Sequence, residues 1–168
     1  MEYVRAACAT LIVLVFAASA VSKLRDFDGF ARSLPALAPV GAGLVRPLAL
    51  VIVAAETATP ILLAVPPATS YGFALACALL AAFTAAIAVA LRRGRRAPCR
   101  CFGASSVPVG HRHLVRNGAL LIVTVLGGLA PQGLPAPAGL AVAATAGVVG
   151  AVLIISFDDV VDLFARSS

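Results

Sequence analysis

The sequence has little of what a soluble enzyme needs. It has no tryptophan and one methionine, and charged residues make up only 12% of its 168 residues. It has no nucleophilic triad, phosphate-binding glycine loop or dinucleotide fingerprint, so it predicts no self-contained soluble enzyme. The segments poorest in apolar residues, 23–46 and 92–113, are too short for a water-soluble domain of ordinary size.

The chain is rich in apolar residues. Apolar residues make up 61% of it, and the mean hydropathy of +1.04 lies well above the range of soluble domains. A helix that crosses about 30 Å of hydrocarbon needs roughly 20 residues. The sequence therefore predicts an all-α fold, a multi-pass transmembrane bundle of four to five spanning helices that forms one integral membrane domain over residues 1–168. The expected spans are about 4–22, 47–65, 71–91, 114–130 and 138–157.

The net charge of +6 is concentrated on one side of these spans. Basic residues cluster in 23–46 and 92–116, whereas 65–70 and 131–139 carry no charge. By the positive-inside rule this pattern predicts a plasma (inner) membrane protein with its N-terminus outside and its basic loops cytoplasmic. The partner of the basic residues is then the lipid bilayer, and no nucleic acid is expected. Part of 23–46 is expected to form an amphipathic helix on the inner leaflet.

The first span has an alternative interpretation as a secretory signal. The stretch AASA at 17–20 fits a small-residue cleavage site that follows an apolar core, with Arg5 as a thin charged region. Cleavage would place the arginine cluster at 92–96 outside, against the charge bias. We therefore expect the first span to be retained.

Glu56 is an acidic residue near the middle of the second span. An ionised carboxylate there is costly, so we expect it to be protonated, paired or facing a polar interior. Lys23 or an arginine of the basic loops is the expected ionic partner, although Lys23 is expected about three turns away in depth. Two interpretations stay open. Glu56 handles protons beside a redox centre, or it is a protonated packing group that hydrogen-bonds to Ser19, Thr57, Thr59 or a backbone carbonyl.

Cys99 and Cys101 lie in APCRCFG, directly after the cluster RRGRR. A disulfide at this spacing closes a small, strained ring, and strained disulfides are oxidising and labile. The upstream arginines, and Arg100 between the two thiols, favour the thiolate. Pro98 and Gly103 bracket the pair and predict a tight, exposed turn. The pattern favours a thiol–disulfide exchange site; the alternative is two unreactive cysteines at the membrane interface.

The same loop offers a set of soft and borderline metal ligands. These are Cys99, Cys101, His111 and His113. Such a set could hold tetrahedral zinc or copper(I). Familiar zinc modules separate paired cysteines by two to four residues and paired histidines by three to five, so these one-residue gaps make chelation awkward. We therefore expect no metal and no cofactor.

Four stretches together resemble a known group of membrane proteins. They are SAVSKLRDFDGFARSL at the end of the first span, AAETATPILL around Glu56, CRCFG, and LVRNGALL at the start of the fourth span. They are similar to the MauE family, which is associated with methylamine utilisation and related to the DoxX-like membrane proteins. The family is regarded as helping to process, transport or mature the disulfide-rich β-subunit of methylamine dehydrogenase, and it commonly accompanies a thioredoxin-like partner.

The resemblance covers nearly the whole chain and implies roles for particular residues. It implies a redox role for Cys99 and Cys101, beside Glu56. It gives structural or functional weight to Lys23, Phe102, Gly103, Arg116 and Asn117. Asn117 is expected to cap the fourth helix or to bond the preceding loop.

The sequence thus predicts a membrane redox-accessory protein whose cysteine pair exchanges disulfides with a thioredoxin-like protein while an exported, disulfide-containing client matures. Whether the chain itself acts as an oxidoreductase stays open. One alternative is a binding or transport module for a small ligand or metal near Glu56, and another is a membrane anchor for a thioredoxin-like enzyme.

The predicted cytoplasmic position of Cys99 and Cys101 conflicts with an exported client, because the cytosol keeps thiols reduced. Such a pair needs an outward acceptor, for which Cys8 and Cys77 are the candidates, or the orientation is inverted. Taken alone, these two cysteines are interpreted as buried and inert.

Overall fold

The computed structural model of the chain describes residues 2–37, 40–93, 110–133 and 136–157, and every regular element in these ranges is helical. The elements are, in chain order, α1 (Glu2–Arg25), α2 (Phe27–Leu37), α3 (Ala42–Ala64), the 3-10 turn η1 (Pro66–Ala68), α4 (Thr69–Arg92), α5 (His111–Leu129) and α6 (Pro137–Ile155). The all-α prediction is therefore confirmed, since these ranges contain no strand.

Four helical segments are long and apolar enough to cross a membrane. They are α1, α3, η1 together with α4, and α6, and they match four of the five expected spans. The remaining expected span, 114–130, falls on α5. Polar residues in the first two turns of α5, among them Arg112, Arg116 and Asn117, leave it a shorter apolar run. The chain is thus a multi-pass membrane protein, as its composition predicts.

The start of the second span differs from the prediction. We expected it at Pro47, whereas α3 begins at Ala42 and contains both Arg46 and Pro47. The charge of Arg46 interrupts the apolar run in the sequence. In the structure its exposed guanidinium pairs with Asp28 of α2, so the helix continues through Arg46 without burying a charge. The expected amphipathic helix is α2, whose apolar face packs on α3.

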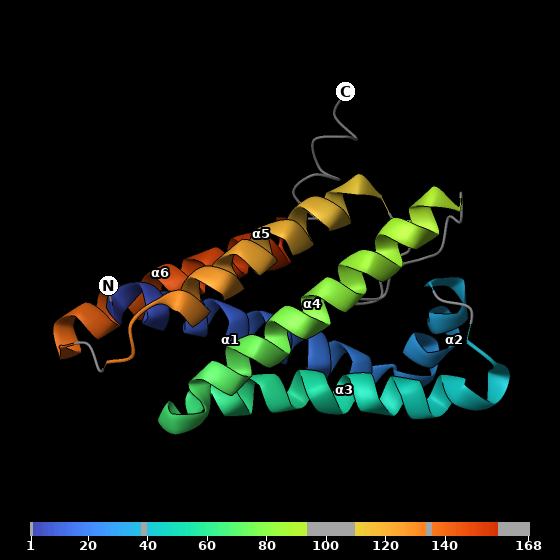
Figure 1. The fold of residues 1–168 in the computed structure, drawn as a ribbon, viewed down its shortest axis with the longest axis horizontal. Coiled ribbons are helices and arrows are strands. Elements are labelled where there is room, and N and C mark those ends of the chain that lie inside the picture. The colour runs from blue at the N-terminus through green and yellow to red at the C-terminus, as the bar shows by residue number, and fades with distance from the viewer. Residues whose placement is uncertain (1, 38–39, 94–109, 134–135, 158–168) are drawn as a thin grey trace.

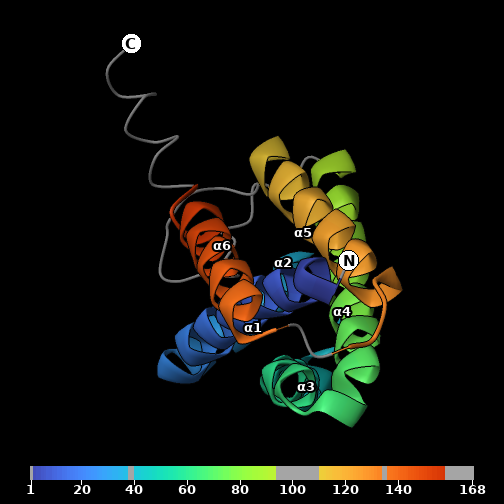
Figure 2. The same ribbon diagram turned by 90° about the vertical axis from the view of Figure 1, so that its left-hand side faces the viewer.

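Helix α1 lies in the middle of the bundle (Figures 1 and 2) and packs against α3, α5 and α6, while α4 packs between α3 and α5. Figure 1 shows two distinct ends. We call one the basic end: the last turn of α1, all of α2, the first turns of α3 and α5, and the last turn of α4. The opposite end holds the N-terminus of α1 and the last turn of α5, and we call it the Arg5 end.

The apolar core follows α1. Its buried members are Cys8, Ile12, Val15, Phe16, Leu63, Phe73, Ala76, Leu80, Leu120 and Ala151. Glycine allows a close approach between α1 and α6. A Cβ on Gly147 would lie 2.6 Å from the carbonyl oxygen of Ala7 and 2.7 Å from Cβ of Thr10. Small residues at helix contacts are typical of membrane bundles, where close packing replaces the hydrophobic effect between helices.

Candidate functional site

A deeply buried ion pair joins α1 and α3. Nζ of Lys23 lies 2.7 Å from each carboxylate oxygen of Glu56, and the two side chains are 1% and 2% exposed. Nζ also donates to Oγ of Ser19 at 2.6 Å, and that hydroxyl donates to Oε2 of Glu56 at 3.2 Å. Each charge is therefore both paired and hydrogen-bonded, which is the condition under which a buried ion pair is tolerated.

Local geometry explains why these three residues meet. Ser19 and Lys23 are four residues apart on α1, so their side chains lie on one face of the helix. Figure 1 shows α3 reaching past the end of α1, beneath α2. Glu56, near the middle of α3, is therefore level with the last turns of α1. The expected pairing of Glu56 with Lys23 is present, and the expected depth difference between them was wrong because the shift of α3 along α1 does not show in hydropathy.

Two aromatic rings also lie near the ammonium group of Lys23. Nζ of Lys23 lies 5.2 Å from the ring centroid of Phe30 on α2 and 5.4 Å from that of Phe83 on α4. At these distances the faces of the rings attract a cation. Four helices thus contribute to one charge pair, which fixes their relative positions.

A small cavity adjoins the pair. Its volume is about 20 Å³, and its lining residues are Phe16, Ser19, Lys23, Glu56, Leu80, Phe83 and Asn117. It has polar partners and room for about one water molecule. An organic ligand does not fit in this space. The cavity as described is therefore suited to a water molecule.

Asn117 was expected to cap the fourth helix or to bond the preceding loop, and the structure corrects the first of these alternatives. The N-cap of α5 is Gly110, whose carbonyl accepts from the backbone N–H of His113 at 3.0 Å. Asn117 therefore lies in the second helical turn, where its side chain is buried and lines the cavity beside the ion pair. The polar residues that precede it from His111 onward belong to the same helix.

The remaining predicted residues of α5 lie in its first two turns. His111 is exposed, whereas His113 and Arg116 are buried. Nδ1 of His113 accepts a hydrogen bond from the backbone N–H of Gly110 at 3.3 Å, so this nitrogen already has a partner. Within the described ranges, no group of three or more His, Cys, Asp or Glu side chains is placed to hold a metal ion.

Cys99, Cys101, Phe102 and Gly103 lie outside the described residues, in the segment 94–109. The helices on either side of this segment, α4 and α5, supply Phe83 and Asn117 to the buried site. Asn117 is six residues along α5 from its first residue, about 9 Å along the helix axis. The last turn of α4 and the first turn of α5, which flank this segment in the sequence, both lie at the basic end.

The other two cysteines are free thiols within the bundle. Cys8 belongs to the apolar core and Cys77 is half-buried on α4. A Cβ added to Gly127 would lie 2.7 Å from Cβ of Cys8, which shows how closely this cysteine is packed. Close apolar packing agrees with the interpretation of Cys8 as an inert residue.

Arg5 is a structural residue whose role the sequence did not reveal. Its side chain is buried, at 7% exposure, and its charge is satisfied by hydrogen bonds. The guanidinium donates to the carbonyl oxygens of Gly127 (3.4 Å) and Ala130 (3.1 Å) and to Oγ of Ser70 (3.0 Å). It also lies 5.3 Å from the ring centroid of Phe73. A cation beside the last carbonyls of α5 is favourable because the helix dipole is negative there. The available signal was an arginine placed within the first apolar run.

Comparison with known proteins identifies the family. The family model "Methylamine utilisation protein MauE" matches residues 1–131, which include the Lys23–Glu56 site and both cysteines of the segment 94–109. The "Methylamine utilization protein MauE" of Paracoccus denitrificans is 35% identical over 153 residues, covering 87% of this chain and 79% of that protein. No solved structure matches the chain. The chain therefore belongs to the MauE family.

Proposed function

We propose that this protein is a membrane redox-accessory protein of methylamine utilisation. It handles disulfides, by thiol–disulfide exchange at Cys99 and Cys101, during maturation or transport of a partner such as the β-subunit of methylamine dehydrogenase. Membership of the MauE family supports the pathway. The observation that supports this site is structural: α4 and α5, the helices on either side of the cysteine segment, both line the cavity beside the buried, paired carboxylate of Glu56.

The proposed chemistry is a two-step exchange. The thiolate of one cysteine attacks a sulfur of the partner's disulfide, forming a mixed disulfide and releasing the partner's second sulfur as a thiolate, which takes up a proton. The other cysteine of the pair then gives up its proton and attacks the mixed disulfide. The partner leaves as a dithiol and the pair is left oxidised, so two electrons have moved to the partner. The reverse sequence oxidises the partner.

Glu56 is the proposed proton-handling group of this site. Each step of the exchange takes up or releases a proton, and exposed thiols can trade it with water. The carboxylate of Glu56 is buried, contacts an ammonium and a hydroxyl, and lines a cavity with room for about one water molecule. These contacts support a role for Glu56 in taking up or releasing the protons of the exchange. Lys23 is a positioning residue in this scheme, since it holds the carboxylate in place.

We further propose that the basic end faces the cytoplasm and that the N-terminus of α1 faces out. The support is the position of Lys23, Arg25, Arg46 and Arg92 at that end, with uncharged connections at the other. In a variant with Cys8 and Cys77 replaced by serine, an impermeant maleimide should label the remaining cysteines only after the membrane is opened. Labelling in intact spheroplasts would show the opposite orientation.

The proposed client can be tested in Paracoccus denitrificans cells whose own MauE is replaced by this chain. The wild-type chain should restore growth on methylamine and a disulfide-bonded β-subunit of methylamine dehydrogenase. The double variant Cys99→Ser/Cys101→Ser should lose most of that subunit, because it cannot exchange disulfides. The control Cys8→Ser/Cys77→Ser should resemble the wild type.

The outcomes separate the proposal from its alternatives. Full maturation of the β-subunit with the Cys99→Ser/Cys101→Ser chain would contradict thiol exchange and support a membrane anchor. A wild-type chain that reaches the membrane without restoring the subunit would contradict the methylamine dehydrogenase client. Alkylation of the subunit's thiols followed by mass spectrometry measures its oxidised fraction directly.

A further inference from the structure

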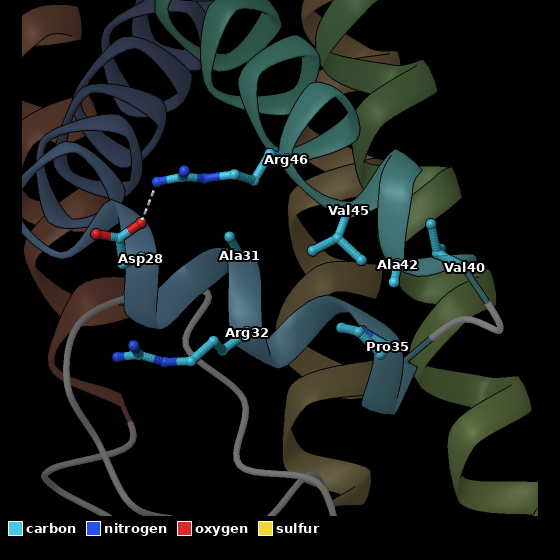
Figure 3. Close-up of a pocket in the computed structure, with 8 residues that line it drawn as sticks. All are labelled: Asp28, Ala31, Arg32, Pro35, Val40, Ala42, Val45 and Arg46. Atoms are coloured by element: carbon cyan, nitrogen blue, oxygen red, sulfur yellow. Dashed lines mark hydrogen bonds and ion pairs between the residues drawn. The ribbon is translucent and has the colours of Figure 1, made fainter.

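A groove at the basic end lies apart from the ion-pair site. It runs between α2 and the first turns of α3, has a volume of about 500 Å³, and is shown in Figure 3. Its lining residues are Asp28, Ala31, Arg32, Pro35, Val40, Ala42, Val45 and Arg46. The lining is thus an apolar wall with three charged side chains, and Glu56 is not among the described residues that form it.

The groove lies where a membrane surface is expected. Helix α2 has 11 residues, too few to cross the hydrocarbon. It connects two helices of spanning length, α1 and α3, and buries Phe30, Ala31 and Leu34 against α3. A short amphipathic helix between two spans lies in the interface, with its polar face toward the headgroups. Arg32 and Asp28 are on that exposed face.

The charges of the groove favour an anion. Arg46 donates from Nη2 to Oδ1 of Asp28 at 2.8 Å, and these side chains are 73% and 65% exposed. An ion pair as exposed as this contributes little, so another anion can compete for Arg46. Arg32 lies one turn after Asp28 on α2, and no acidic side chain in the described ranges forms an ion pair with it. Figure 3 shows both arginine side chains extending toward the Asp28 end of the groove.

We propose that this groove binds one anionic phospholipid. Its phosphate lies between Arg32 and Arg46, since guanidinium groups match phosphate oxygens with paired hydrogen bonds. An acyl chain lies along the apolar wall, formed by Ala31, Pro35 and Val45. The lipid is favoured over a soluble anion because the groove combines two cations with this wall at the membrane surface. Anionic lipids of the cytoplasmic leaflet are attracted to basic residues beside spanning helices.

Asp28 gives the proposal an internal control. Its carboxylate occupies Arg46 when no lipid is bound, so it competes with the phosphate. Asp28→Asn removes the competing charge and should tighten lipid binding. Arg32→Gln and Arg46→Gln should each weaken it by about tenfold, because each removes charge-assisted hydrogen bonds to the phosphate. The opposite directions distinguish a binding site from general loss of structure.

The test uses full-length protein purified from vesicles of phosphatidylglycerol and phosphatidylcholine in equal amounts. Native mass spectrometry should show one retained phosphatidylglycerol, fewer adducts in Arg32→Gln and Arg46→Gln, and more in Asp28→Asn. The matched control is Arg92→Gln, which removes an exposed arginine of α4 at the same end of the bundle and should leave retention unchanged.

Three results would overturn the proposal. They are equal retention of both lipids, loss of phosphatidylglycerol from the Arg92→Gln control to the same extent, and displacement of the lipid by millimolar inorganic phosphate, which would make free phosphate the ligand. Circular dichroism of each variant checks that its helices are intact. The proposal is independent of the thiol chemistry, and the double cysteine variant should retain the lipid like the wild type.

Discussion

Replacing Lys23 with methionine, or Glu56 with leucine, is expected to lower the free energy of unfolding by about 3–5 kcal/mol. Each change removes one partner and leaves the other charge buried at 1–2% exposure, among Ser19 and two phenylalanine rings. The double variant Lys23→Met/Glu56→Leu should recover most of this loss, because it leaves no unpaired charge. The measurement is denaturant unfolding in mixed micelles, followed by circular dichroism since the chain has no tryptophan.

The chain provides a matched control in its second ion pair. The charged atoms of Arg46 and Asp28 lie 2.8 Å apart, close to the 2.7 Å of the Lys23–Glu56 pair, but both side chains are largely exposed. Arg46→Met should therefore change the unfolding free energy by less than about 1 kcal/mol. If the effects of Lys23→Met and Glu56→Leu simply add in the double variant, the two side chains are not coupled and the described pair is wrong.

The double variant also separates the two interpretations of Glu56. If the ion pair only joins helices, a chain that folds without it should exchange disulfides at the normal rate. If Glu56 handles a proton for the cysteines, the folded double variant should remain slow. A positioning role for Lys23 would show as partial function in Lys23→Arg, which keeps the positive charge.

Much of the fold could be predicted from the sequence because the length of each apolar run indicates whether it forms a membrane-spanning helix. The spans of α1, α4 and α6 lie close to their predicted ranges, and α2 is the expected amphipathic helix. The pairing of Glu56 with Lys23 was also predictable. Pairing with a cation is one way to accommodate an intramembrane carboxylate, and Lys23 lies at the end of the preceding span.

What could not be predicted depends on how the helices shift and rotate against one another. The depth of Lys23 relative to Glu56 depends on α3 extending beyond α1, which hydropathy does not show. Asn117 lies inside α5 because the helix starts at His111 and includes polar turns that a hydropathy window rejects. The role of Arg5 depends on carbonyls more than 120 residues away in the chain, which no local pattern indicates.

The second large effect is expected at the cysteine pair itself. With Cys99 replaced by serine, Cys101 can still attack a partner disulfide, but no second thiol remains to resolve the mixed disulfide. The adduct should therefore accumulate, whereas in the wild type it is transient. Cys101→Ser tests the reverse assignment, and the variant whose adduct accumulates more retains the attacking thiol. Cys8→Ser and Cys77→Ser should trap nothing, because Cys8 is closely packed in the core and neither residue belongs to the pair.

The most direct test of thiol–disulfide exchange at Cys99 and Cys101 is this trapping measurement in membranes, read by non-reducing electrophoresis and mass spectrometry of the adduct. The predicted result is a mixed disulfide between Cys101 of the Cys99→Ser chain and a thioredoxin-like protein, lost on reduction and absent from Cys99→Ser/Cys101→Ser. Absence of any such adduct, under both oxidising and reducing conditions, would contradict thiol–disulfide exchange as the function of this protein.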